Sequence, residues 1–180
     1  MIDKNVKILC GIVTYNPDIE RFSECIKSLE SELRDLLIYD NASNNINDIK
    51  NVINESTLKH EIKTADKNQG IATGLKYIMN YAMNKSYDYV LTLDQDSIIQ
   101  KGLINKYLEY INNNETGALT CIIKDRETDG LYNIVESKEI EECNFAITSG
   151  FFIKVSTYKK ISGYDEKLFI DNVDFDLCFE

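Results

Sequence analysis

The chain has 180 residues, of which 43% are hydrophobic and 28% are charged, a balance typical of a folded globular protein and not of a disordered one. This length can bury a sheet with helices packed on it, and no apolar run approaches the ~20 residues that span a bilayer. The formal net charge of −10, without any stripe of Lys or Arg, argues against nucleic acid as a partner, because an acidic surface repels phosphate backbones.

The cysteines and the N-terminus bear on the cellular compartment. The cysteines are odd in number, widely spaced and without a CxxC pair, so we expect reduced thiols in a cytoplasmic protein. They are Cys10, Cys25, Cys121, Cys143 and Cys178. Residues 1–5 are polar and lead directly into an apolar run, so we expect no signal peptide.

Strand-like and helical patterns alternate along residues 1–100. Short apolar or alternating runs predict strands at Val6–Val13, Leu36–Tyr39, Leu58–Thr64 and Tyr87–Leu93. Apolar residues at helical spacing predict helices over Ile19–Leu33, Ile46–Asn54 and Ile71–Asn84, and the single proline, Pro17, lies where the first would begin. This alternation indicates an α/β fold with a largely parallel sheet.

The pattern changes in the second half of the chain. We expect a helix over Leu103–Asn112, strands over Ala118–Ile123 and Ala146–Val155, and a hairpin turn at Asp129-Gly130. Residues 139–142 are acidic, and the last residues run on without a helix C-cap signal. We therefore expect a single domain over residues 1–180 that is truncated within a helix.

Three polar loops follow predicted strands, at Thr14–Asn16, Asp40–Asn44 and Asp94–Asp96. Ligands of parallel α/β sheets bind beyond the carboxyl ends of the strands, so these loops should converge on one crevice. The carboxylates of Asp94 and Asp96 suit a hard divalent ion, Mg²⁺ or Mn²⁺, whose coordination a diphosphate would complete. In so acidic a chain a metal is the natural counter-charge for a diphosphate. The alternative is that Asp94 or Asp96 caps the next helix.

The motifs, taken in order, resemble those of family 2 glycosyltransferases of the GT-A fold, and more narrowly their rhamnosyltransferase-like branch. They are Val13-Thr14-Tyr15-Asn16, Asp40-Asn41-Ala42-Ser43, Asn68-Gln69-Gly70-Ile71-Ala72, Asp94-Gln95-Asp96, Thr148-Ser149-Gly150 and Phe169-Ile170-Asp171-Asn172-Val173-Asp174. The resemblance implies a nucleotide-sugar-binding half over residues 1–100 and an acceptor and catalytic half over residues 101–180.

The resemblance also implies residue roles on the donor side. Thr14, Tyr15 and Asn16 would cradle the nucleotide, and Asp40 would accept a hydrogen bond from the N3–H of uracil or thymine, which selects a UDP- or dTDP-sugar. The alternative for Asp40 is an Asx-turn. The other donor-side residues are Asn68, Gly70, Asp94 and Gln95, with Lys67 either near a phosphate or simply solvated.

On the acceptor side the resemblance assigns Asp174 as the general base of an inverting transfer. Ser149 and Gly150 would line the acceptor site, with Asp171 as a supporting residue. The alternative for Asp171 and Asp174 is that they are carboxylates favoured at a helix N-terminus. Where family members often carry an aromatic residue and then an arginine, this chain has Leu177 and Glu180, so a contact made by that arginine would be missing.

The family's usual acceptors are cell-surface or lipid-linked glycans, and its donor here would be dTDP-rhamnose. The resemblance therefore implies an enzyme of polysaccharide synthesis in the cytoplasm, with peripheral association at the inner membrane face conceivable for the full-length enzyme. No basic amphipathic helix supports anchoring.

Two other functions remain open. A haloacid-dehalogenase-type phosphohydrolase also uses a DxD after an apolar strand, but on its first strand, and Ile98 replaces the expected Thr or Val. A non-catalytic nucleotide-sugar-binding module would fit the truncation and the altered last motif. The lone histidine, His60, has no partner pattern, and neither a GxGxxG motif nor a P-loop is present.

Overall fold

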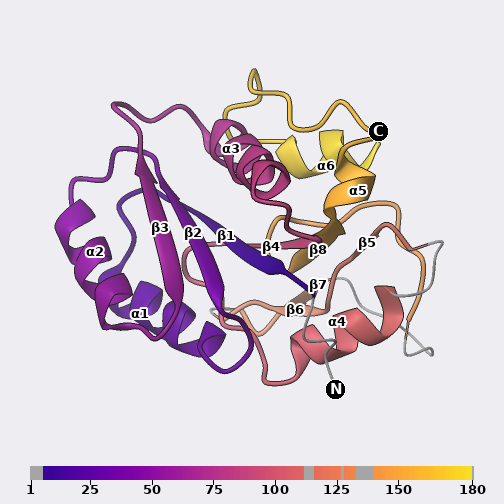
Figure 1. Ribbon diagram of the computed structural model, residues 1–180, viewed down its shortest axis with the longest axis horizontal. Coiled ribbons are helices and arrows are strands. Elements are labelled where there is room, and N and C mark those ends of the chain that lie inside the picture. Colours follow the sequence, from indigo (N-terminus) through magenta and orange to yellow (C-terminus); the bar gives the residue numbers. More distant parts are fainter. Residues whose placement is uncertain (1–5, 112–115, 127, 133–139, 180) are drawn as a thin grey trace.

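The computed structural model describes residues 6–111, 116–126, 128–132 and 140–179 (Figure 1). Its first half contains strands β1 (Ile8–Thr14), β2 (Asp35–Asp40), β3 (Lys59–Thr64) and β4 (Tyr89–Leu93). They alternate with helices α1 (Ile19–Leu29), α2 (Ile46–Glu55) and α3 (Ile71–Asn84). The predicted alternation of strands and helices is confirmed.

The second half is less regular. It contains α4 (Leu103–Ile111), β5 (Ala118–Leu119), β6 (Ile123–Lys124), β7 (Leu131–Tyr132), β8 (Phe151–Lys154), α5 (Val155–Tyr158) and α6 (Val173–Cys178). The prediction of one strand over Ala118–Ile123 is wrong: β5 joins the main sheet, whereas β6 pairs with β7. The predicted hairpin is confirmed by that antiparallel pair and by a hydrogen bond of 2.8 Å from Asp125 N–H to the Gly130 carbonyl. Glu139 lies outside the described residues.

The main sheet has six strands in the order β3-β2-β1-β4-β8-β5. Strands β3, β2, β1 and β4 are parallel, whereas β8 runs antiparallel to both β4 and β5. The expected mixed, mostly parallel sheet is therefore confirmed. Strands from both halves of the chain build it, so segments of the second half are fixed to the same scaffold as the loops of the first half.

Helices cover both faces of this sheet (Figure 1): α1, α2 and α4 lie on one face, and α3, α5 and α6 lie on the other. A hydrophobic core lies on each face of the sheet, and alternate residues of β1 pack into the two cores. Cys10 and Ile12 pack toward α1, whereas Leu9 packs toward α3. Because β1 is buried on both faces, successive residues must be apolar, which explains the continuous apolar run in the sequence.

Helix α1 begins as its sequence predicts and ends earlier. Pro17 precedes the N-cap Asp18, whose carboxylate accepts a hydrogen bond of 3.0 Å from Arg21 N–H. The helix ends at Leu29 and not at Leu33, yet Leu33 is buried at 8% exposure. Its apolar character reflects burial under a turn and not a further helical turn.

None of the helices in the described ranges is both long enough and apolar enough to cross a bilayer. This agrees with the absence of a long apolar run in the sequence.

Close packing of α3 on β1 predicts the effect of a small substitution. A Cβ at Gly11 would lie 2.3 Å from Cγ2 of Ile78, which is fully buried. We expect Gly11→Ala to lower the free energy of unfolding by about 1–3 kcal/mol, because the core must shift to admit the methyl group. In urea titrations the double variant Gly11→Ala with Ile78→Ala should be less destabilised than the sum of the single variants. Strict additivity would contradict this packing.

Candidate functional site

The ends of three neighbouring parallel strands meet at one edge of the sheet, as the sequence predicts. The loops after β1, β2 and β4 are joined there by hydrogen bonds between residues far apart in sequence. Tyr15 N–H donates to Gln95 Oε1 at 2.9 Å, and Asn16 N–H donates to Ser43 Oγ at 2.8 Å. The side chain of Asn16 in turn accepts from Asn44 N–H at 2.8 Å.

Asp40 lies beneath these loops and is fully buried. Its Oδ1 accepts a hydrogen bond of 3.0 Å from the Thr14 hydroxyl, and its Oδ2 accepts one of 3.1 Å from Ser43 N–H. The second bond joins residues three apart and holds the start of the loop after β2, whereas the bond of an Asx-turn joins residues two apart. With no exposed surface, the carboxylate would meet a base only after this loop shifts.

The loop Asn68-Gln69-Gly70 is fastened to β2 by the buried side chain of Asn41. Its amide donates to the Gly70 carbonyl at 3.0 Å, and its Oδ1 accepts from Gln69 N–H at 3.0 Å. Asn68 Oδ1 accepts from Gly70 N–H at 2.9 Å and closes the turn. Asn41 therefore joins the loop before α3 to the loop after β2.

The lack of a side chain at Gly70 makes room for the backbone of another segment, and not only for a ligand. Its φ is +86°, and a Cβ there would lie 2.4 Å from the Phe169 carbonyl oxygen. That carbonyl accepts a hydrogen bond of 2.8 Å from Ile71 N–H at the start of α3. Glycine is thus required both by its positive φ and by the chain that crosses it. The segment before α6 passes directly over the donor-side loop.

Asp94, Asp96 and Asp174 form an acidic group beyond β4. Burial, together with the negative charges of Asp96 and Asp174, raises the pKa of Asp94 to about 6. Asp96 is exposed, whereas Asp94 and Asp174 are partly buried. Asp174 on α6 therefore lies near enough to Asp94 to raise its pKa, although the two aspartates are 80 positions apart in the sequence.

Segment 148–150 connects this acidic group to the sheet. The Thr148 hydroxyl donates a short hydrogen bond to Asp174 Oδ1, and the hydroxyls of Ser149 and Ser97 lie 2.5 Å apart. Gly150 is buried, where its N–H donates to the Thr92 carbonyl at 3.0 Å and its carbonyl accepts from the Tyr107 hydroxyl at 2.7 Å.

Two candidate residues stay apart from these networks. Asp171 is exposed in the turn before α6, and Lys67 is exposed on the loop before α3. Within the described part of the chain, neither makes a hydrogen bond or an ion pair.

Several residues of the network were not singled out from the sequence. Asn41, Ser43, Ser97 and Thr148 hold the loops together. Asn41, Ser43 and Thr148 lie within the quoted motifs and Ser97 directly follows Asp96, so their place in loops rich in short polar side chains is the signal that could have found them.

The oxygen ligands that the protein offers suit a hard divalent cation only if other ligands complete its coordination. Among the described residues no three His, Cys, Asp or Glu side chains are arranged to hold a metal by themselves. Asp94 and Asp96 are two oxygen donors in a region of mutually repelling charge. Mg²⁺ in nucleotide sites is commonly held by one or two carboxylates, with phosphate oxygens and water as its other ligands. The residues present fit that arrangement.

Residues 10–170 match the family model described as glycosyl transferase family 2. A dTDP-rhamnosyl transferase of Shigella flexneri, RfbF, is 25% identical over 196 residues, which cover 97% of this chain and 62% of RfbF. The chain therefore spans less than two thirds of that relative's length.

Solved structures agree on the fold. S. aureus TarS 1-349 in complex with UDP superposes with a TM-score of 0.73 at 16% identity, over 96% of this chain and 54% of that chain. The mannosyltransferase PcManGT of Pyrobaculum calidifontis, in complex with GDP-Man and Mn²⁺, gives a TM-score of 0.69 at 14% identity, over 93% of this chain and 49% of that chain. The chain thus has the GT-A fold and, with the motifs in their expected order, belongs to glycosyl transferase family 2, where it resembles the rhamnosyltransferase-like members.

Proposed function

We propose that this chain is the donor-binding and catalytic region of an inverting, metal-dependent glycosyltransferase. It moves a sugar from a UDP- or dTDP-sugar to a hydroxyl group of a glycan acceptor. The observation that carries the proposal is the chain of contacts from the DxD loop to the candidate base: the Ser97 hydroxyl lies 2.5 Å from the Ser149 hydroxyl, and the neighbouring Thr148 hydroxyl donates to Asp174. Family membership supports the same chemistry.

The nucleoside would lie over the loop Thr14–Asn16. Tyr15 is 48% exposed, so its ring offers a face on which a pyrimidine can stack. Asp40 would contact the N3–H of the base once the loop above it shifts, and until then it holds that loop in place through Thr14 and Ser43. Gln95 fixes the backbone of Tyr15 against the DxD segment.

Asp94 and Asp96 would hold Mg²⁺ or Mn²⁺ together with the diphosphate of the donor. The cation would supply positive charge to the leaving nucleoside diphosphate as its bond to the sugar breaks. A relative in fold, PcManGT, was solved with Mn²⁺. A bound cation would also relieve the repulsion that raises the pKa of Asp94.

Asp174 would act as the general base. The Thr148 hydroxyl occupies its Oδ1, which orients the carboxylate and leaves Oδ2 to take the proton from the acceptor hydroxyl. The acceptor oxygen then bonds to the anomeric carbon as the bond from that carbon to the diphosphate breaks, with inversion at that carbon. Ser149 and Asp171 are proposed for the acceptor side.

The relative RfbF is named a dTDP-rhamnosyl transferase, and this supports dTDP-rhamnose as the donor to test first. We propose a cell-surface or lipid-linked glycan as acceptor, and a cytoplasmic enzyme that works near the inner face of the membrane.

Removal of the DxD carboxylates should abolish metal-dependent nucleotide binding. We expect wild-type protein to bind UDP or dTDP by calorimetry only with Mg²⁺ or Mn²⁺, and Asp94→Asn with Asp96→Asn to lose this binding. Glu109→Gln, which removes an exposed carboxylate on α4, should bind normally. A panel of nucleotide-sugars, scored by metal-dependent thermal stabilisation, identifies the donor. Wild-type protein that binds no nucleotide with metal would refute the proposal.

Metal-dependent binding should weaken in acid. The metal requires ionised Asp94, whose pKa is about 6, so affinity should fall as the pH drops through that value, to roughly one tenth at about pH 5. The metal-free protein should show the opposite trend. Because the pKa of Asp94 is raised in the folded state, its protonation stabilises the protein at low pH. This contribution to stability is lost as the pH rises from the pKa of the unfolded state to about 6.

Asp94→Asn should therefore stabilise the metal-free protein at neutral pH, by up to roughly 3 kcal/mol, and have little effect near pH 4. Urea unfolding in EDTA at the two pH values measures this difference. An equal effect at both pH values would be inconsistent with the raised pKa.

Loss of the base should separate catalysis from binding. We expect Asp174→Asn to bind the donor normally and to release nucleoside diphosphate about 10²–10⁴-fold more slowly, because base assistance is lost. Asp176→Asn, on the same helix, is the matched control and should remain active. If wild-type protein binds donor and never cleaves it, the chain is a binding module and the catalytic part of the proposal fails.

A further inference from the structure

A surface pocket of about 230 Å³ lies beside α3, near the edge strand β3. Tyr39 and Lys63 approach it from β2 and β3, Gln69 from the loop before α3, and Tyr77 and Asn80 from α3 itself. Neither the DxD aspartates nor Asp174 is among the described residues that line it. The pocket is therefore separate from the candidate transfer site.

Aromatic and neutral polar groups dominate its chemistry. The rings of Tyr39 and Tyr77 are 5.3 Å apart at an interplanar angle of 49°, and Tyr77 is 36% exposed. The Tyr39 hydroxyl donates to Gln69 Oε1 at 3.2 Å, which leaves the Gln69 amide NH₂ to donate to a ligand. The Asn80 amide adds a further donor and acceptor. An apolar ring face ringed by amides and hydroxyls is suited to a sugar, whose C–H face stacks on a tyrosine and whose hydroxyls need partners.

Of the charged residues that line the pocket, two form an ion pair and one lysine is left over. Lys76 Nζ lies 2.7 Å from Glu166 Oε2, so its positive charge is paired, and Lys63 contributes the remaining one. A single lysine on a flexible stem is a weak phosphate site compared with the several donors that phosphates usually receive. An uncharged ligand fits this lining better than an anionic one.

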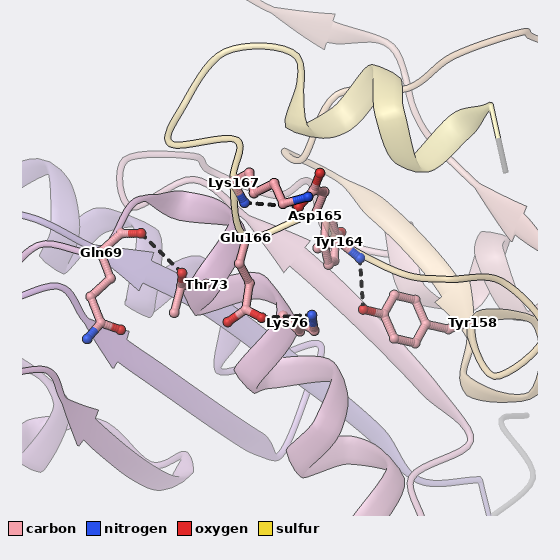
Figure 2. A network of polar contacts seen from close by, with 8 residues as sticks. All are labelled: Gln69, Thr73, Lys76, Tyr158, Tyr164, Asp165, Glu166 and Lys167. Atoms are coloured by element: carbon pink, nitrogen blue, oxygen red, sulfur yellow. Dashed lines mark hydrogen bonds and ion pairs between the residues drawn. The ribbon is translucent and has the colours of Figure 1, made fainter.

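Glu166, on the segment that leads to α6, lines one side of the pocket, and Figure 2 shows its carboxylate facing Lys76 of α3. Residues 165–168 form a turn in which Asp165 accepts hydrogen bonds of 3.0 Å from the backbones of Lys167 and Leu168, and Glu166 is paired with α3. The chain then crosses Gly70 at Phe169 and continues to α6. A ligand in the pocket would thus contact Glu166, which lies eight positions before Asp174 in the sequence.

We propose that this pocket binds one pyranose ring of the acceptor glycan, away from the ring that receives the transferred sugar. Pockets for drug-sized ligands have volumes of about 300–1,000 Å³, so this smaller one suits a single ring and excludes a nucleotide-sugar. The assignment of the ring to an acceptor rests on the proposed function. The binding of a sugar here rests only on the pocket.

Neutral methyl glycosides test the pocket directly. Methyl α-L-rhamnoside, methyl β-D-glucoside and methyl N-acetyl-β-D-glucosaminide are each titrated to millimolar concentration into ¹⁵N-labelled protein. At least one should shift the amide signals of Thr73, Tyr77 and Asn80 in a saturable way. Tyr77→Ala and Asn80→Ala should each weaken that binding at least tenfold, whereas Tyr77→Phe keeps the ring and should retain most of it. Asn105→Ala, an exposed position on α4, should bind normally.

Three results would overturn the inference. The first is that no glycoside shifts these signals. The second is that inorganic phosphate shifts them more strongly than any glycoside and Lys63→Ala removes the effect. The third is that UDP with Mg²⁺ displaces the glycoside. The chain with Asp94→Asn and Asp96→Asn separates this test from that of the proposed function, because it should lose metal-dependent UDP binding and still bind the glycoside.

Discussion

The hydrogen bond from the buried Thr14 hydroxyl to the Asp40 carboxylate joins the ends of β1 and β2, and the rest of the site extends from it. A buried carboxylate is costly unless it is hydrogen-bonded, so Asp40 also draws in the backbone of Ser43. Ser43 then holds Asn16, and the neighbouring Asn41 holds Gly70. One buried, hydrogen-bonded carboxyl group, that of Asp40, thus orders the loops after β1 and β2 and the loop before α3.

The carboxylate of Asp94 has different neighbours from that of Asp40. Asp40 has two hydrogen-bond donors, whereas Asp94 has two negative neighbours and a raised pKa. In a chain of net charge −10 there is little surplus positive charge to offset this repulsion. The mutual repulsion of these aspartates therefore coincides with the place where we propose a divalent cation.

Much of this arrangement could be predicted from the sequence, because local patterns determine it. Apolar runs such as that of β1 identify buried parallel strands, and parallel strands place their following loops at one edge. The antiparallel position of β8 could not be predicted, because pairing depends on partners distant in sequence. The crossing of Phe169 over Gly70 and the bond from Thr148 to Asp174 are equally long-range. For Asp40 the sequence left two interpretations open, contact with a base and an Asx-turn, and in the structure its carboxylate is buried and bonded to Thr14 and Ser43.

The backbone crossing at Gly70 has a consequence for attempts to exchange specificities between relatives. Because the loop before α3 and the segment before α6 interlock with no room for a side chain, neither can be transplanted alone. A chimera that imports a foreign loop at 68–70 inherits a mismatched partner at Phe169. In this scaffold the two segments are therefore expected to be exchanged together, and recombination within the family should keep both segments from the same parent.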